Sequence, residues 1–458
     1  MGMLGKTKGG WSRSSYRFGM TFAALLAVGT PLSAEDKPGQ RPSAPLLQPW
    51  LDGPYATGNW GGLRDRLTSA GVTFSGSYTS DLLGNPVGGR SQGFANFQWL
   101  ELKLAFDLEK LAGWSGGQFV ISALSVAGQD LSAAYVGNFF TASQLQTPMN
   151  TFVLYDLYFQ QRLLDDRFRI KVGRYSAGEE VGRLSILGVY VNGADDSHPS
   201  GLGANFIFPT PPKPTWTGLV EFKPVEELAL KYVIYQTNDW YRLADTHGWD
   251  FGIRPGDGIS MVWEADWRPH LALPWGGEVT TPSPDGKTVT SAAATFPGEY
   301  RFGVYYSNFG YGNFDHGVTR DNFGFYWFGQ QQIWQETPGS TQGLTVWAVF
   351  TLSPQERIAQ FPFTAGWGAS WVGLIPGRDK DLTLFGAYYG IVSPLYAEAQ
   401  EESGQGYPTE ELALEWSYRF QVTPWLYLQP DLQWIVRPGG TGNIPDALIL
   451  GGEIGVTF

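Results

Sequence analysis

Apolar and polar residues alternate along the last twelve positions of the chain. Leu450, Ile454 and Phe458 fall on one side with other apolar residues, whereas Glu453 and Thr457 fall on the other, which is small or polar at most positions. A period of two residues is typical of a β-strand whose two faces meet different environments. The pattern therefore predicts a strand at 447–458 with one apolar face.

The same alternation recurs along most of the chain. Within 97–108, Leu102 and Leu104 face one way, and Glu101 and Lys103 face the other. The predicted strands are 72–83, 97–108, 118–126, 151–161, 168–174, 215–222, 228–236, 258–268, 299–308, 322–334, 344–352, 361–372, 382–391, 411–421, 425–436 and 447–458. An even number of strands, about 16 here, is typical of barrels in bacterial outer membranes, and the terminal Phe458 fits that class. The predicted fold is therefore all-β, a transmembrane antiparallel β-barrel.

The connections between these strands alternate in length. Short turns include 163–167 and 224–227, and long loops include 127–150 and 176–203. Outer-membrane barrels have short periplasmic turns and longer outer loops, so both ends of the mature chain are expected in the periplasm. Residues 270–297 are long where a short turn is due. We interpret them as an insertion on the periplasmic side, with a missed hairpin as the alternative.

The N-terminus carries the features of an export signal. Four cations precede an apolar stretch from Met20 to Val28, and small residues follow up to Ala34. This order is typical of a secretory signal peptide, which we predict at 1–34 with cleavage after Ala34.

The next segment, 35–70, is predicted to be an N-terminal periplasmic segment with a short helix. Asn59 can cap this helix, and Leu63 and Leu67, four residues apart, form an apolar face that needs a surface to cover. Residues 71–458 then form the predicted barrel.

Composition excludes several classes of protein. No stretch after residue 34 approaches 18 consecutive apolar residues, which argues against membrane-spanning helices. The chain has no cysteine, and therefore no disulfide framework or thiol nucleophile. A formal net charge of −12 argues against nucleic acid as a partner. Aromatic residues at 15% and charged residues at 16% fit a barrel whose outer face meets lipid.

Five short runs resemble a known family. They are 59–64 (NWGGLR), 71–74 (GVTF), 83–85 (LGN), 171–174 (KVGR) and 439–447 (GGTGNIPDA). In this order they are similar to carbohydrate-selective porins of the OprB type, over essentially the whole mature chain. The resemblance implies a 16-stranded outer-membrane barrel that admits sugars by passive diffusion. The long turn at 270–297 departs from the family pattern at the periplasmic mouth.

The candidate residues for substrate selection lie on and near a long loop that can narrow the barrel. Sixteen strands enclose an aqueous channel, and selectivity then depends on a constriction lined with charged and hydrogen-bonding groups. Loop 176–203 is long and also carries Asp195 and Asp196. Cationic donors opposite carboxylate acceptors can replace the water that a neutral sugar loses. The candidate constriction residues are Arg169, Lys171, Arg174, Arg183, Glu101, Lys103, Glu179 and Glu180.

Other polar and aromatic positions receive separate interpretations. The loop residues Phe139, Phe140 and Tyr190 are candidates to cover the apolar face of a sugar ring. The inward-phased charges are interpreted as an ion-pair lattice that braces the wall: Glu415, Arg419, Asp431 and Glu453. For every candidate charge, the alternative is a solvated wall or loop residue without substrate contact.

The predicted function is passive, carbohydrate-selective diffusion of monosaccharides such as glucose across the outer membrane, with disaccharides left open. The expected partners are small neutral sugars and the lipid and lipopolysaccharide of the membrane; monomer and homotrimer are both left open. We predict no enzyme activity, cofactor or metal, because the four histidines lie in predicted loops without ligand spacing. The neighbours Ser197 and His198 do not by themselves make a catalytic dyad.

Three other functions remain open at this point. A general, non-selective porin and an occluded structural or export barrel share the fold and differ in conductance. A secreted soluble β protein, a lectin or a glycosidase, would use the apolar strand faces as a core, and would be extracted without detergent.

Overall fold

The computed structural model describes residues 48–458 except 147–148, 195–196, 239–242 and 283–288. The predicted signal peptide, residues 35–47 and the pair Asp195 and Asp196 lie outside the described residues. No helix in the described part of the chain is long and apolar enough to cross a membrane.

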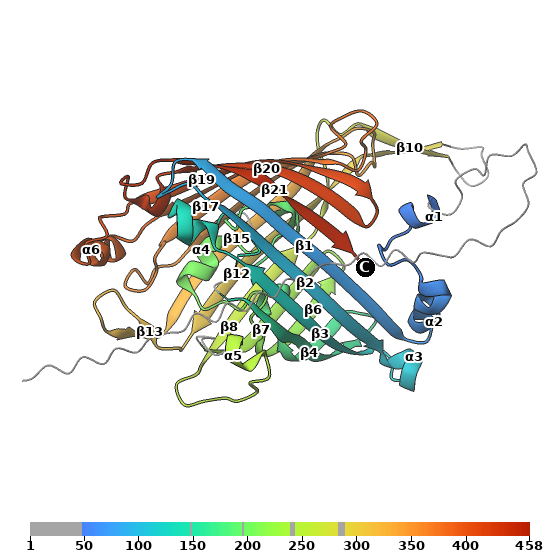
Figure 1. Cartoon of the computed structure of the whole chain (residues 1–458). Helices are drawn as coiled ribbons and strands as arrows, with labels where there is room; N and C mark the ends of the chain where they lie inside the picture. Colours follow the sequence, from blue (N-terminus) through green and yellow to red (C-terminus); the bar gives the residue numbers. More distant parts are fainter. Residues whose placement is uncertain (1–47, 147–148, 195–196, 239–242, 283–288) are drawn as a thin grey trace, which may run out of the picture. The chain divides into compact units, whose positions relative to one another are not determined.

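Sixteen strands of the described chain form a closed antiparallel barrel (Figure 1), in which each strand pairs with the next and β21 pairs with β1. They are β1 (Val72–Val87), β2 (Phe94–Asp107), β3 (Gly117–Gly128), β4 (Thr151–Leu163), β5 (Phe168–Tyr175), β6 (Thr215–Val225), β7 (Leu228–Thr237), β8 (Gly258–Trp267), β12 (Thr295–Ser307), β15 (Asn322–Gln335), β16 (Gly343–Leu352), β17 (Phe363–Val372), β18 (Leu382–Ile391), β19 (Glu410–Thr423), β20 (Leu426–Val436) and β21 (Ala447–Thr457). The predicted barrel is confirmed, and the predicted strands agree with these to within a few residues.

The alternation in the sequence becomes the two faces of the wall. Trp416 and Leu450 are 43% and 42% exposed and face outward, whereas Ala413, Ile449 and Glu453 are buried and face the lumen. Outward apolar side chains are exposed in this way around the ring. A soluble lectin or glycosidase would bury these faces, so the wall is built to meet lipid.

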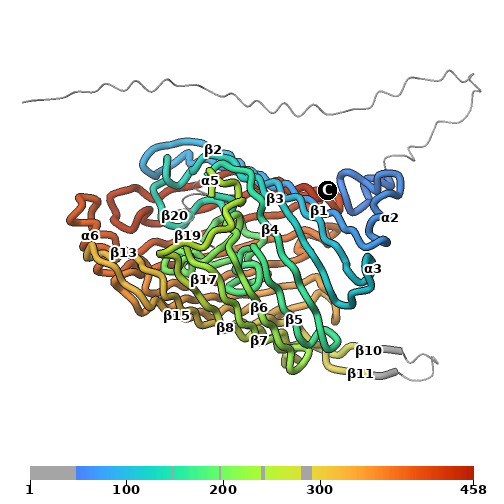
Figure 2. Tube along the Cα trace, turned by 90° about the horizontal axis from the view of Figure 1, so that it is seen from below, coloured from blue at the N-terminus to red at the C-terminus, as the bar shows by residue number. Residues whose placement is uncertain are grey.

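The two ends of the barrel differ. One end carries the short turns, the helices α2 (Leu63–Ser69) and α3 (Leu108–Ala112) and the C-terminus, and the other end carries the long loops with α6 (Pro394–Glu402) and β13 (Tyr311–Gly312) (Figures 1 and 2). We call these the turn end and the loop end; the rule that outer-membrane barrels have short periplasmic turns predicts the periplasm at the turn end. The remaining short elements are α1 (Gln48–Leu51), η1 (Trp60–Gly62), η2 (Ser132–Val136), η3 (Ala177–Glu179), η4 (Ser185–Val189), α4 (Ser200–Asn205), α5 (Leu243–Thr246), β14 (Val318–Thr319) and η5 (Pro438–Gly440).

The described parts of the long connection at 270–297 form short paired strands that project at the turn end. The strand β9 (His270–Ala272) pairs with the first residues of β12, and β10 (Glu278–Pro282) pairs with β11 (Val289–Ala293). These short strands prolong β8 and β12 and add no strand to the barrel ring (Figure 2).

The lumen is partly filled by chain from the loop end. Side chains of 176–214, including Leu187, Tyr190 and Phe206, form one buried apolar cluster with wall residues such as Tyr305 and Phe328. Such a cluster resembles a domain core, so the described part of this loop, called the constriction loop below, is packed against the wall.

The segment before β1 lies on the seam where β1 meets β21. The backbone N–H of Ala56 donates to the carbonyl oxygen of Thr457 at 2.8 Å. Contrary to the expectation for Asn59, Gly62 is the N-cap of α2, and Asn59 instead accepts a hydrogen bond from the N–H of Asp65, six residues on, at 3.2 Å. Contrary to the expectation for Leu63, that side chain is 45% exposed, and the buried residue of the helix is Arg64.

Candidate functional site

Two cavities lie within the barrel and meet at five residues. The outer cavity, of about 900 Å³, is lined by loop residues such as Phe140 and Phe361, and the inner cavity, of about 460 Å³, by turn residues such as Glu226 and Arg268. The residues that line both cavities are Arg162, Arg169, Glu179, Glu180 and Arg183. We call these five residues the junction.

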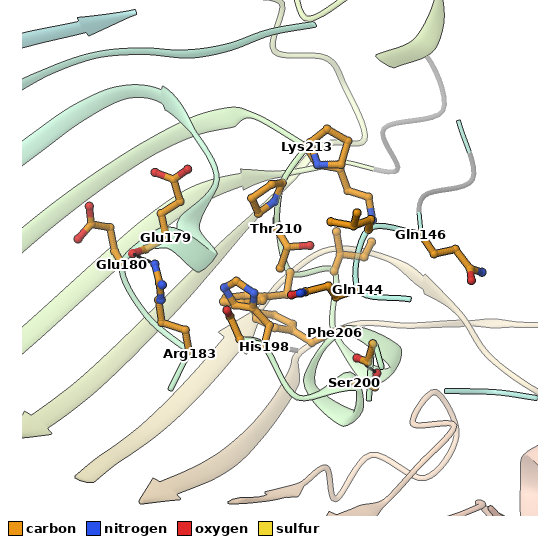
Figure 3. Close-up of a pocket in the computed structure, with 18 of the residues that line it drawn as sticks. Gln144, Gln146, Glu179, Glu180, Arg183, His198, Ser200, Phe206, Thr210 and Lys213 are labelled. Atoms are coloured by element: carbon orange, nitrogen blue, oxygen red, sulfur yellow. Dashed lines mark hydrogen bonds between the residues drawn. The ribbon is translucent and has the colours of Figure 1, made fainter. Parts of the chain in front are cut away.

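The strand β5 and the constriction loop bring the junction together. Alternation along β5 turns Arg169 and Lys171 to the lumen, and the chain bends inward at Ser176, whose hydroxyl donates to the carbonyl oxygen of Lys213. The short helix η3 then carries Glu179 and Glu180 back towards β5. Figure 3 shows Glu179, Glu180 and Arg183 together on one side of the outer cavity.

Glu180 is bound by two cations. Its carboxylate oxygens lie 2.6 Å from Arg169 Nη2 and 3.0 Å from Lys171 Nζ. Burial alone would raise the pKa of Glu180, but the charges and hydrogen bonds of Lys171 and Arg169 outweigh burial and lower the pKa to about 2. Arg169 also binds Glu221 at 2.9 Å, and Lys171 lies 3.8 Å from the ring centroid of Tyr158.

Glu179 is in a different electrostatic state. The hydroxyl of Tyr155 donates to Glu179 at 2.5 Å, and Lys171 Nζ is 3.9 Å away. Burial and the neighbouring charge of Asp156 raise the pKa of Glu179 to about 7, against the opposing effect of Lys171 and Lys103. One carboxylate of the junction is therefore ionised at neutral pH, and the other titrates there.

Arg183 is the junction cation least engaged by the protein. Within the described ranges it makes no ion pair, and its Nη1 donates only a long hydrogen bond of 3.5 Å, to the carbonyl oxygen of Glu179. Arg162, the remaining junction cation, is half-exposed and lies 3.7 Å from Asp166. Guanidinium donors without a protein partner are available to a hydroxylated solute.

Other predicted site residues lie near the junction or apart from it. Lys103 lines the outer cavity and binds Glu101 at 2.9 Å and Asp156 at 3.1 Å, whereas Glu101 lines neither cavity. Arg174 is not brought to the junction. Its guanidinium donates to the carbonyl oxygens of Gly248 and Asp250, and it lines a separate cavity together with residues such as Leu243 and Asp257.

Of the three aromatic candidates, two line the outer cavity and one does not. Phe139 and Phe140 line the outer cavity. Tyr190 is fully buried, and its hydroxyl bonds to the carbonyl oxygen of Phe385 and to Trp347, so it belongs to the packing of the constriction loop.

Carboxylates of the wall fix the constriction loop by accepting its backbone N–H groups. Glu264 accepts from Gly182, and Glu415 accepts from Val191 and Asn192. Of the expected ion-pair lattice, Arg419 and Glu453 form a pair at 3.2 Å, but Glu415 binds the loop instead. Lys231, Glu264, Asp266 and Arg301 form a further buried ion-pair network on β7, β8 and β12. All four residues lie at inward positions of their strands, so the alternation in the sequence could have predicted this network.

Histidine and acidic side chains are also possible metal ligands. The described residues contain no group of three or more histidine, cysteine or acidic side chains placed to hold a metal ion. Burial lowers the pKa of His198 to about 4, and its Nε2 lies 2.6 Å from the carbonyl oxygen of Gly178. This histidine therefore holds a loop turn.

A closed sixteen-stranded barrel with an apolar outer belt and a narrowed, charged lumen defines a diffusion channel of an outer membrane. Residues 91–458 match the family described as carbohydrate-selective porin, OprB family, and the chain belongs to it. The protein is a sugar-selective porin of the outer membrane. Membership of a porin family indicates a channel rather than an enzyme.

Relatives and solved structures agree with this family. Porin B of Pseudomonas aeruginosa is 24% identical, over 88% of this chain and 91% of its own. Putative porin QuiX of Acinetobacter baylyi is 23% identical, over 89% and 94%. The high pH structure of Pseudomonas putida OprB matches the fold with a TM-score of 0.79 and 22% identity, over 89% of this chain and 99% of that one.

Proposed function

We propose that the protein admits neutral monosaccharides such as glucose by passive diffusion, and that the junction is the constriction at which the sugar is bound. One observation carries the proposal: the outer and inner cavities share Arg162, Arg169, Glu179, Glu180 and Arg183. A solute that passes from one cavity to the other meets donors and acceptors at this place. Such a lining can replace the water lost by sugar hydroxyls while remaining weak enough to release the sugar.

Within the junction the cations have different roles. Arg169 and Lys171 are already bound to carboxylates, whereas the guanidinium of Arg183 is available. Arg183 is therefore the residue whose removal should weaken sugar binding most without disturbing the wall.

The test is ion current through the refolded mature chain in a lipid bilayer, with glucose, maltose or an uncharged non-sugar of similar size added. We expect a saturable block by glucose, and a Kd for that block roughly five- to tenfold weaker in Arg183→Ala, the effect of losing a hydrogen bond from a charged donor. Arg320→Ala, on an outer loop away from both cavities, is the matched control and should keep the wild-type Kd. Current without discrimination would indicate a general porin, and no current would indicate an occluded barrel.

The remaining partners are proposed from the outer surface. The exposed apolar belt would contact membrane lipid and, at the loop end, lipopolysaccharide. Whether the chain assembles as a homotrimer is tested by its mass in detergent solution.

A further inference from the structure

A further cavity, of about 460 Å³, opens at the loop end beside the outer cavity. We call it the rim cavity. Four outer connections that are far apart in the sequence supply its walls, through residues such as Arg90, Asn138, Gln405 and Asn443. The proposed constriction uses none of these residues.

The rim cavity has the chemistry of a site for an uncharged, hydroxyl-rich ring. Its polar lining consists mainly of amides and hydroxyls, supplied by Asn138, Gln400, Gln405, Asn443, Ser132 and Thr441. These groups donate and accept hydrogen bonds equally well. Arg90 is the one charged residue among those that line it, and no carboxylate does, so the lining does not suit a metal cation.

Phe139 connects the rim cavity to the outer cavity, because its side chain lines both. The ring makes edge contacts with Phe361 and Tyr396, at centroid distances of 5.4 Å and 6.3 Å. Contacts of this kind hold an aromatic ring in one orientation. The rim cavity and the outer cavity therefore adjoin at Phe139.

The walls of the rim cavity are fixed by one buried carboxylate. Glu411 accepts the N–H groups of Phe139 at 2.8 Å, Phe140 at 2.8 Å and Gly439 at 2.7 Å, and so joins two of the loops that line the cavity. Gly439 and Gly440 have φ of 67° and 72°, a backbone conformation that favours glycine. The run 439–447, singled out in the sequence, thus shapes one wall of this cavity.

We propose that the rim cavity is an outer capture site for a neutral sugar, which then passes over Phe139 into the channel. The inference rests on the proposed function, because a capture site has a purpose only if sugar traverses the pore. It predicts that the rim residues accelerate the arrival of sugar from the loop end and leave the constriction unaltered.

The test is the double variant Gln405→Ala, Asn443→Ala, in which both replaced side chains are exposed. Current-noise analysis of glucose block, on channels inserted in one orientation, separates the association rates for sugar added at the loop end and at the turn end. We expect the loop-end association rate to fall roughly fivefold, the effect of lost hydrogen bonds, with the turn-end rate and the sugar-free conductance unchanged. Gln92→Ala, an exposed amide outside the cavity, is the control.

The outcomes separate the two proposals. Wild-type block with an unchanged loop-end rate in the double variant would overturn the capture site alone. Absence of glucose block in the wild type would overturn the proposed function, and the capture site with it.

Discussion

The two adjacent glutamates of the junction respond differently to pH. The pKa of Glu180 is near 2, because Lys171 and Arg169 outweigh the effect of burial, so its charge is constant around neutrality. Burial and Asp156 raise the pKa of Glu179 to about 7, so Glu179 is mostly neutral at pH 6 and mostly ionised at pH 8. Glu179 lines both the outer and the inner cavity, so its charge acts on ions that pass the junction between them.

We therefore predict that the ratio of cation to anion permeability rises with pH, with its midpoint near pH 7. Reversal potentials in a salt gradient, measured from pH 5.5 to 8.5, give this ratio directly. Glu179→Gln should remove the step, and Glu226→Gln, at the turn end of the inner cavity, should retain it. A flat wild-type profile would contradict the assignment of the titrating group.

Two arginines of the junction should also differ in their effect on stability. Arg169→Ala leaves the buried Glu221 without its closest cation and leaves Glu180 with Lys171 alone, and breaking such a buried pair costs about 3 kcal/mol. Arg183→Ala leaves no carboxylate of the described chain unpaired and should cost much less. Samples heated to increasing temperatures before gel electrophoresis show the temperature at which the folded band disappears, and this temperature ranks the two variants. An equal loss of stability in both would refute the different roles of Arg169 and Arg183.

Among the structural elements, the segment before β1 links the first and last strands of the barrel, β1 and β21. Arg64, only 5% exposed, donates to the carbonyl oxygens of Phe458 at 2.6 Å and Phe74 at 3.1 Å, and its guanidinium stacks on the ring of Tyr55. These contacts join the last strand, the first strand and the N-terminal segment through one side chain.

Arg64→Ala should therefore destabilise the closed barrel by about 2–3 kcal/mol, the sum expected for charged hydrogen bonds and a cation–π contact. Chemical unfolding followed by tryptophan fluorescence measures this change. Arg66→Ala removes an exposed cation from the same helix and is the control. The sugar-free conductance should stay the same in both, since neither residue lines the two cavities.

The elements that the sequence predicted well are those with a simple period. Alternation located all sixteen strands, and it correctly turned Arg169 and Lys171 inward. The same rule, applied consistently, would have excluded Arg174, which is three residues from Lys171 and so belongs to the opposite face. Loops have no period: nothing in the sequence reveals that Tyr190 is buried in the constriction loop, or that Glu415 and Glu264 bind backbone N–H groups there.

For the whole molecule, the projecting hairpin at 270–297 is separate from the conducting path. No residue of this connection, among those the structure describes, lines the outer or the inner cavity. The paired residues Ala272 and Thr295 face each other across the hairpin, so a two-residue Asn-Gly turn can join them in place of 273–294.

We expect this shortened chain to fold into the same barrel, with the conductance and the glucose-block Kd of the full chain. In the described part of the hairpin, stability comes mainly from local pairing and from a hydrogen bond that Trp275 donates to the carbonyl oxygen of Ile333, so its loss should cost about 1 kcal/mol. Bilayer recordings compare the glucose block of the shortened chain with that of the full chain. Arg183→Ala, which should weaken the block, is the positive control that shows a change can be detected. A changed conductance would place the hairpin at the periplasmic mouth of the pore, whereas unchanged transport confines its role to the periplasmic surface.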